Sequence, residues 1–199
     1  MLFVVSGPSG CGKSTIIHHL MMDLRCVRFS VSHTTRPKRP SEEEGRDYYF
    51  VNRAEFQRMI ARRQFLEWAV VHGHYYGSSK KEVAGKGKGV DLILDVDVQG
   101  ARQIRSSGHK AIFVFVLPPV YNELRRRLKE RGEDSAEVIE RRLKNARKEI
   151  LEYVHFDHLV VNDTLDRAVL ELESIILSAR SRIDVRRPAV GTILKSFGT

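Results

Sequence analysis

The sequence predicts an α/β fold in which a parallel β-sheet is flanked by helices. Three observations predict it: short apolar runs rich in Val, Ile and Phe, amphipathic stretches of helical length between them, and a glycine-rich turn directly after the first run. Strands separated by such helices form parallel sheets, because the chain must cross back before the next strand begins. With 199 residues the chain can bury a sizeable core as one domain, with room for a small inserted subdomain.

The expected elements follow from these patterns in chain order. Strands are expected at residues 2–5, 90–98, 111–117 and 158–162, and helices at 14–24, 99–106, 120–130, 136–152 and 165–182. The stretch from residue 28 to residue 79 is different, being aromatic, basic and rich in turns, with short β-like pieces and one helix near residues 54–61. A long segment inserted between core elements is commonly functional, so we expect the second substrate there. No structure or role is predicted for residues 186–199.

The composition is that of a folded protein with many basic side chains that could bind phosphate. Hydrophobic residues make up 42% of the chain, and the formal net charge is +9. Basic clusters alternate with glutamates in helical patterns, which suits several phosphates at one site as well as a nucleic acid duplex, so charge alone does not decide between them. No apolar run approaches the roughly 18 residues of a membrane span. Two cysteines form no disulfide framework, so the cytoplasm is the expected compartment, without a cleaved signal or a membrane partner.

The glycine-rich turn "SGPSGCGKST" has the pattern G-x-x-x-x-G-K-[ST] of a phosphate-binding loop. Its glycines let backbone N–H groups turn inward, the next helix adds its positive end, and Lys13 adds a charge for the terminal phosphates. The predicted triphosphate-binding residues are Gly7, Pro8, Ser9, Gly10, Cys11, Gly12, Lys13, Ser14 and Thr15. Ser14 is also expected to ligate Mg²⁺. Cys11 either fills a variable loop position or has a pKa lowered by the nearby positive charge.

Two carboxylates end the strand "LILDVDV", at Asp95 and Asp97. Since strand side chains alternate, both are expected to project from the same side. Asp95 is the predicted partner of the Mg²⁺, directly or through water, and Asp97 either joins it or caps the next helix. Residues 97–100 also spell D-x-x-G, a GTPase switch pattern, but the chain has no N-K-x-D guanine motif, so a GTPase is disfavoured.

Five segments together resemble the guanylate kinase family in order and spacing: "SVSHTTRPKRPSEEEGRDYYFV", "FLEWAVVHGHYYGSS", "LILDVDVQGA", "RLKERGEDSAEVIERRL" and "VVND". The resemblance runs from Leu2 to about Arg180. It implies a P-loop kinase fold and an enzyme that uses ATP and Mg²⁺ to phosphorylate GMP and dGMP. No nucleic acid partner is expected. It also implies a core (residues 1–31, 90–125 and 153–185), a GMP-binding α+β insert (32–88), a helical lid (about 126–152) and the tail.

The resemblance also assigns the acceptor site. The two carboxylate oxygens of Glu67 would accept hydrogen bonds from guanine N1–H and N2–H₂. Ser32 would bind on the side of the guanine carbonyl group, and Asp97 would lie near the exocyclic amine. AMP would leave the charge of Glu67 unpaired, which discriminates strongly. The acceptor phosphate would be held by a clamp of two guanidinium and two phenol groups. The clamp residues are Arg36, Arg39, Tyr48 and Tyr76, and the further positions near the nucleotide are Glu42 and Ser78.

In the family, arginines at the positions of Arg127, Arg131 and Arg142 reach the triphosphate when the lid closes. Arg131 and Gly132 before a capping Ser135 are a plausible hinge. Asn162 is expected to contact the adenine, with a helix cap as the competing account. Since the GMP phosphate is already anionic, no general base is required, and alignment with charge neutralisation by Lys13, Mg²⁺ and the arginines is the expected catalysis. The predicted catalytic residues are Lys13, Arg36, Arg131 and Arg142.

One departure from the family pattern is His33, which stands where serine is common; beside a phosphate it would make GMP affinity depend on pH near neutrality. Two alternatives to the kinase remain at this stage. One is a non-catalytic guanylate-kinase-like binding module, which the intact loop disfavours, and the other is a P-loop kinase for a sugar phosphate, which would not need Glu67 with Ser32. The sequence does not decide between a monomer and a homo-oligomer.

Overall fold

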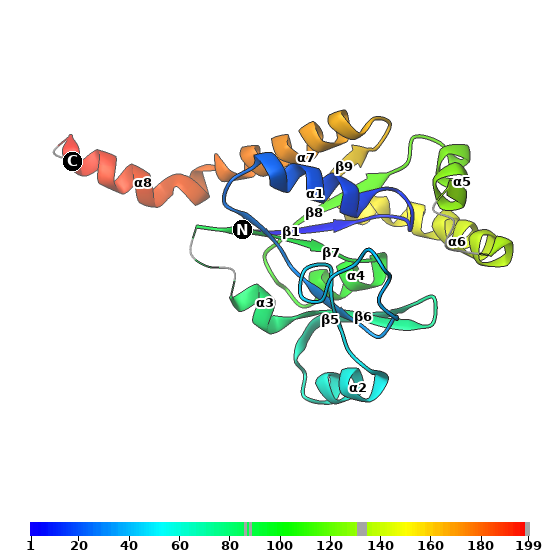
Figure 1. The fold of residues 1–199 in the computed structure, drawn as a ribbon. Coiled ribbons are helices and arrows are strands. Elements are labelled where there is room, and N and C mark those ends of the chain that lie inside the picture. The colour runs from blue at the N-terminus through cyan, green and yellow to red at the C-terminus, as the bar shows by residue number, and fades with distance from the viewer. Residues whose placement is uncertain (86, 88, 131–134, 198–199) are drawn as a thin grey trace.

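The computed structural model describes residues 1–85, 87, 89–130 and 135–197, and the predicted α/β architecture is confirmed there (Figure 1). In this part of the chain a five-stranded sheet has the order β2-β7-β1-β8-β9, and every pairing in it is parallel. Its strands are β1 (Leu2–Ser6), β2 (Val27–Phe29), β7 (Asp91–Asp95), β8 (Ile112–Leu117) and β9 (His158–Val161). The three residues of β2, too few to carry a clear pattern, had not been predicted as a core strand.

Helices cover both faces of this sheet, because its strands are apolar on both sides. The helices outside the insert are α1 (Lys13–Asp23), α4 (Val98–Ser106), α5 (Tyr121–Glu130), α6 (Ala136–Glu149), α7 (Leu165–Arg180) and α8 (Ile183–Ser196). Phe3 and Val5 pack with α1 and α7, whereas Leu2 and Val4 pack with α4. Figure 1 shows α1 and α7 on one side of β1 and α4 on the other.

The chain between β2 and β7 builds a second sheet. Among the described residues it has four strands in the order β4-β3-β6-β5, with β5 and β6 forming an antiparallel hairpin. Its elements are β3 (Ser32–Thr34), β4 (Tyr48–Phe50), α2 (Arg53–Ala61), β5 (Phe65–Val71), β6 (His74–Ser79) and α3 (Lys80–Ala84). The Phe56 ring of α2 stacks on Phe65 of β5 at a centroid distance of 4.4 Å, which fastens the helix to the sheet.

Helices α5 and α6 form a pair beside the carboxyl end of the core sheet (Figure 1). Ile139, Leu143 and Ala146 face inward, as predicted, and pack with Leu124 and Leu128 of α5. Ser135 caps α6 by accepting a hydrogen bond from the Val138 N–H. The predicted helix over residues 136–152 was too long at its end, because a 3₁₀ helix, Ile150–His155, replaces the last turn.

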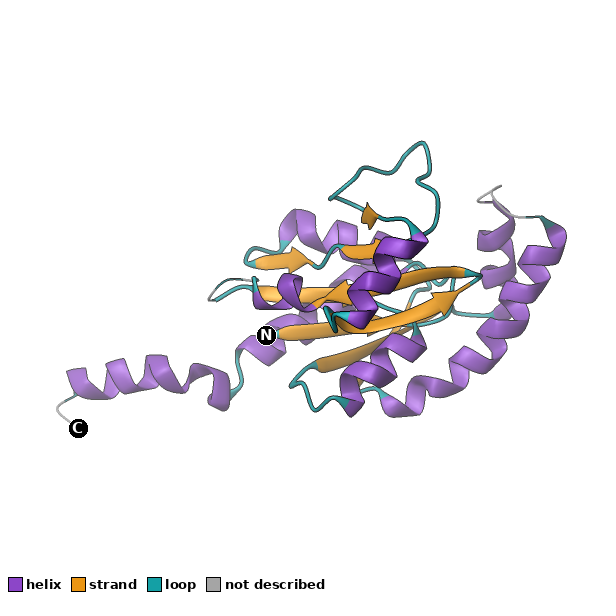
Figure 2. Ribbon diagram, turned by 90° about the horizontal axis from the view of Figure 1, so that it is seen from below, coloured by secondary structure: helices purple, strands orange, loops and turns teal. Residues whose placement is uncertain are grey.

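The end of the chain forms α8, a helix that the sequence pattern had not indicated. Pro188 and Gly191 lie within it, and both residue types lower helix propensity. Figures 1 and 2 show α8 leading away from the core sheet beyond α7. In the described ranges none of the helices combines the length and apolarity that a membrane crossing needs.

Candidate active site

A pocket of about 500 Å³ lies where the carboxyl ends of β1 and β7 meet the second sheet. The predicted site residues that line it are Gly7, Ser9, Gly10, Gly12, Lys13, Ser14, Ser32, Arg36, Arg39, Glu42, Tyr48, Glu67, Tyr76, Asp95, Asp97 and Arg142. The predicted residues that are not among its lining residues are Pro8, Cys11, Thr15, Ser78, Arg127 and Asn162. Arg131 and Gly132 lie outside the described residues.

The phosphate-binding loop joins β1 to α1 and presents the helix N-terminus to the pocket. Gly12 is the N-cap of α1 and has a left-handed backbone with φ 95°, a conformation that glycine adopts without strain. A Cβ atom at Gly12 would also collide with the side-chain amide of Asn162. The helix dipole and free N–H groups make this end a natural anion site.

Lys13 crosses the loop and stands next to an acidic group. Its Nζ donates to the Gly7 carbonyl at 2.8 Å and lies 4.0 Å from Oδ1 of Asp95. Burial disfavours the charge of Lys13, but the nearby carboxylates of Asp95, Glu149 and Asp97 outweigh burial and raise its pKa. The lysine is therefore fully charged at neutral pH.

The oxygen atoms in this part of the pocket fit a Mg²⁺ ion. The Ser14 hydroxyl and the Asp95 carboxylate line the same cavity. Mg²⁺ binds through one or two such protein oxygens together with substrate phosphates and water, and does not need an all-protein cage. The described residues contain no group of three or more His, Cys, Asp or Glu side chains placed to hold a metal by themselves.

The prediction that Asp97 continues the strand on the same side as Asp95 was wrong. β7 ends at Asp95, and Asp97 is the N-cap of α4, where its Oδ1 accepts a hydrogen bond from the Gly100 N–H at 2.9 Å. The helix-cap alternative is therefore correct. Asp97 still lines the pocket, so capping and ligand contact are compatible.

Glu67 is a buried acid in the wall that the second sheet contributes. Only 4% of its surface is exposed, and its Oε1 accepts a hydrogen bond from the Ser78 N–H at 2.8 Å. The hydroxyls of Ser78 and Ser32 are 3.3 Å apart. Burial raises the pKa of Glu67 to about 7, and the nearby charge of Asp97 adds to this effect. The ionised form of this buried carboxyl would be stabilised by a ligand that donates hydrogen bonds to it.

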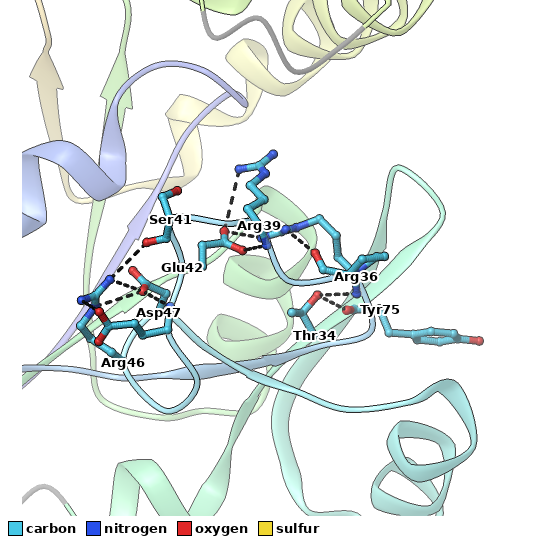
Figure 3. Close-up of polar contacts among 10 residues, drawn as sticks. Thr34, Arg36, Arg39, Ser41, Glu42, Arg46, Asp47 and Tyr75 are labelled. Atoms are coloured by element: carbon cyan, nitrogen blue, oxygen red, sulfur yellow. Dashed lines mark hydrogen bonds and ion pairs between the residues drawn. The ribbon is translucent and has the colours of Figure 1, made fainter.

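The loop after β3 gathers the two arginines of the predicted phosphate clamp around Glu42 (Figure 3). Arg36 donates to the Glu42 carboxylate at 2.5 Å, and the Arg39 backbone N–H donates to its other oxygen at 2.9 Å. Burial opposes the charge of Glu42, but these donors outweigh it and hold the pKa of this carboxyl below its ordinary value. The Arg36 guanidinium also lies 5.5 Å from the Tyr48 ring centre. Burial, helped by Asp95, raises the pKa of Tyr48, so the phenol stays a donor.

Helix α6 brings two side chains to the phosphate-binding loop. Arg142 is 9% exposed and donates to the Ser9 hydroxyl at 3.0 Å. Glu149 also lines the pocket, and its carboxyl lies against the Ser9 backbone and near Lys13; burial is the main reason that its pKa is raised. Sequence reasoning missed Glu149, although the spacing of seven from Arg142 places both on one helix face.

Other lining residues that were not predicted have no motif that could have identified them. They are Ile17, His18, Met21, Phe29, Arg46, Asp47, Ala69, Val71, His72, Gly77 and Val96. Most of them reach the pocket only because the loop, α1 and the second sheet converge there.

Arg127 and Asn162 support the loop from behind. The Asn162 side-chain amide donates to the Cys11 carbonyl at 2.8 Å, and Arg127 donates to the same carbonyl at 3.4 Å and to the Asn162 carbonyl at 2.9 Å. Asp163, in contrast, accepts a hydrogen bond from the Thr164 N–H and pairs with Arg167 at the start of α7. Asn162 therefore braces the loop and does not cap α7, whose N-cap is Thr164 and has no side-chain cap hydrogen bond.

Cys11 has no exposed surface, and burial raises its pKa, so the idea of a lowered pKa was wrong. Cys26 is exposed. We expect a thiol reagent to modify one cysteine rapidly in the native protein and both in denaturant, because Cys11 becomes reachable only when the loop opens. Thiol titration measures this, and the Cys26→Ser variant should show no rapid reaction. Rapid labelling of that variant would contradict the burial of Cys11.

The expectation that His33 lies beside a phosphate was also wrong. Along β3, His33 points away from the face that Ser32 presents to the pocket. Its ring lies 4.8 Å from that of Tyr49 and 5.7 Å from that of Phe65, and it lines a separate cavity under α2. Burial lowers the pKa of His33, so the imidazole is neutral at physiological pH.

Comparisons with known proteins agree with this geometry. The family model described as guanylate kinase matches residues 1–179. The chain is 45% identical to a guanylate kinase of Alkalilimnicola ehrlichii over 98% of this chain and 97% of that protein, and 48% identical to one of Dechloromonas aromatica over 88% and 87%. The crystal structure of guanylate kinase from Anaplasma phagocytophilum superposes with a TM-score of 0.76 at 32% identity, covering 92% of this chain and 87% of that one. The chain therefore belongs to the guanylate kinase family, whose members are nucleoside monophosphate kinases.

Proposed function

We propose that this protein transfers the terminal phosphoryl group of ATP to GMP, and to dGMP, giving ADP and GDP. The observation that carries the proposal is a single pocket shared by the phosphate-binding loop and the buried carboxylate of Glu67. A triphosphate site alone would suit many enzymes, and a buried acid alone would suit many ligands. Together they favour an acceptor that has both a phosphate and a pair of hydrogen-bond donors.

The donor nucleotide would bind at the loop. Backbone N–H groups at the start of α1 would hold its phosphates, and Lys13 would neutralise the terminal one. Ser14 and Asp95 would hold Mg²⁺, which supplies further neutralisation of the phosphate oxygens when it is bound. Asn162 is proposed to contact the adenine while its amide supports the loop.

GMP would bind in the opposite half of the pocket. Glu67 would accept from guanine N1–H and N2–H₂, with Asp97 and the Ser32–Ser78 pair beside it. Arg36, Arg39, Tyr48 and Tyr76 would hold the phosphate, whose charge would compete with the carboxylate of Glu42 for the two guanidinium groups.

Phosphoryl transfer in this arrangement needs positioning and charge neutralisation. The attacking GMP oxygen is already anionic, so no residue has to remove a proton from it. Lys13, Arg36 and Arg142 line the pocket from three different elements, which lets them surround the two phosphate groups. Arg127 and Arg131 are proposed to join them at the triphosphate when the lid closes, which also excludes water that would compete as an acceptor.

The cytoplasm is the proposed site of action, because Cys11 and Cys26 remain unpaired thiols. ATP and GMP are the proposed partners, and both are anions that the basic residues of a chain with a net charge of +9 would attract.

A coupled assay of ADP release tests the proposed function. With ATP and Mg²⁺, we expect turnover with GMP and dGMP and a rate at least about a hundredfold lower with AMP, UMP or CMP, because a buried charge left unpaired discriminates strongly. Removal of divalent metal with EDTA should stop the reaction, and added Mg²⁺ should restore it. No ADP release with GMP would instead favour a non-catalytic binding module, and a comparable rate with AMP would contradict the role of Glu67.

A further inference from the structure

The D-x-x-G sequence at residues 97–100 lies where the core meets the second sheet. Asp97 caps α4, and Gly100 donates the backbone hydrogen bond that completes the cap. Gly100 is buried in the first turn of that helix. Its Cα faces β5, so a side chain at this position would point toward the strand that carries Glu67.

The space beside Gly100 is occupied by the carboxyl group of Glu67. A Cβ atom on Gly100 would lie 3.0 Å from Cδ of Glu67 and nearer still to Oε2. Separations below about 3.0 Å are not tolerated, so something must move. Glu67 has little freedom to retreat, since its Oε1 is bonded to the Ser78 N–H and only 4% of the residue is exposed. The absence of a side chain at Gly100 therefore leaves the space that the Glu67 carboxylate occupies.

A second contact fixes the same strand from the next turn of α4. The Gln103 amide donates to the Trp68 carbonyl at 2.7 Å and accepts from the Trp68 N–H at 3.2 Å. In the described part of the chain β5 is an edge strand, so these backbone groups face no neighbouring strand there. Gln103 takes the place of a strand partner and holds the residue next to Glu67.

We propose that Gly100 and Gln103 are positioning residues that determine guanine specificity, by setting where the Glu67 carboxylate lies relative to Asp97. Both carboxylates line the pocket, one carried by β5 and the other by α4. Gly100 allows the close approach of the two elements, and Gln103 prevents them from sliding apart. The inference rests on the proposed function, because it concerns the residues assigned there to guanine.

A double-mutant cycle on the protein without nucleotide tests the steric part. Gly100→Ala should lower the melting temperature by about 5 °C, since the new methyl group collides with a buried carboxyl. In the Glu67→Ala background the same change should cost much less, because the next contact, with Val96 Cβ at 3.3 Å, is milder and alanine is the better helix former. Gly191→Ala in α8 is the matched control, because among the described residues a Cβ there meets nothing within 4 Å apart from its chain neighbours and its own helix backbone. An equal loss in both backgrounds, or no loss in either, overturns the inference.

Kinetics test the specificity part. Gly100→Ala should raise the KM for GMP by about tenfold or more and reduce the preference for GMP over AMP, while the KM for ATP stays within about twofold. Gln103→Ala should raise the KM for GMP by about threefold, because its hydrogen bonds are partly solvated, whereas Gln57→Ala on the exposed face of α2 should not. An unchanged KM for GMP in Gly100→Ala, or equal losses for GMP and ATP, overturns the proposal. Absence of GMP-dependent ADP release in the wild type would refute the proposed function, and the melting cycle would still decide the positioning.

Discussion

Replacing Lys13 with alanine is expected to lower kcat by about a hundredfold or more while GMP still binds. The Nζ atom lies between the Gly7 carbonyl and Asp95, and its pKa is raised, so a full positive charge is held at the loop. Removing a preorganised charge of this kind costs on the order of 3 kcal/mol of barrier. The loss should appear in kcat, because phosphate charge shifts most in the transition state.

Steady-state kinetics and GMP calorimetry together measure this effect. Lys144→Ala provides a matched control, because Lys144 is an exposed lysine on α6. Near-normal kcat in Lys13→Ala would contradict the mechanism. A similar loss of GMP binding would mean that the substitution had disturbed the whole pocket, which the control and a melting curve would reveal.

Replacing Glu67 with glutamine is expected to weaken GMP binding by about a hundredfold and to leave ATP binding unchanged. A glutamine amide has one acceptor oxygen, and its NH₂ group would face one of the two guanine donors. Loss of a fork of charge-assisted hydrogen bonds accounts for about 3 kcal/mol. Calorimetry with each nucleotide alone separates the two sites, and equal effects on GMP and ATP would contradict the assignment.

The same variant should change how binding and stability depend on pH. The pKa of Glu67 is about 7 in the folded protein and 4.5 in the ordinary case. The folded state thus retains the proton, so this group's stabilising contribution is complete below pH 4.5 and is lost as the pH rises through 7, which amounts to about 3 kcal/mol. Glu67→Gln should be the more stable protein at pH 8 by a comparable margin.

GMP affinity should rise with pH between 6 and 8 in the wild type, since guanine donors prefer the ionised carboxylate. The GMP phosphate titrates in the same pH range, with a second pKa near 6. Its titration affects GMP binding to the wild type and to Glu67→Gln equally. The ratio of the two affinities therefore isolates Glu67. A ratio that does not change with pH would show that the carboxyl has no raised pKa or does not contact the base.

Local sequence patterns correctly predicted the helices and strands that are long, have a regular hydrophobic pattern and end at clear boundary residues. The loop after β1, the capping Ser135 and the inward residues of α6 were all visible as short-range signals, because spacing within one helix or turn defines them. The errors lie at element boundaries and in the tail. β7 ends at Asp95 and α4 begins at Val98, so Asp97 belongs to neither a strand nor the helix interior, and α8 forms despite Pro188 and Gly191.

The site was predicted unevenly for the same reason. His33 looked like a phosphate neighbour from its place in the chain, but the packing of α2 on the second sheet places it in a separate cavity lined by Glu55 and Arg58. Glu149 was missed because its proximity to Lys13 depends on how α6 packs beside the loop. Gly100 was read only as part of a rejected switch motif, since nothing near it in the chain indicates that Glu67 approaches it.

By itself the sequence determined the parallel α/β fold, the phosphate-binding loop and the family, because these depend on residue types at short, regular spacings. Only the tertiary structure decided which side chains share the pocket, how far Glu67 is desolvated, and that Gly100 and Gln103 hold it near Asp97. Those properties arise from contacts such as the one between Trp68 of β5 and Gln103 of α4, which lie 35 residues apart in the chain. The two elements meet only when the second sheet packs on the core, so no local pattern encodes these contacts.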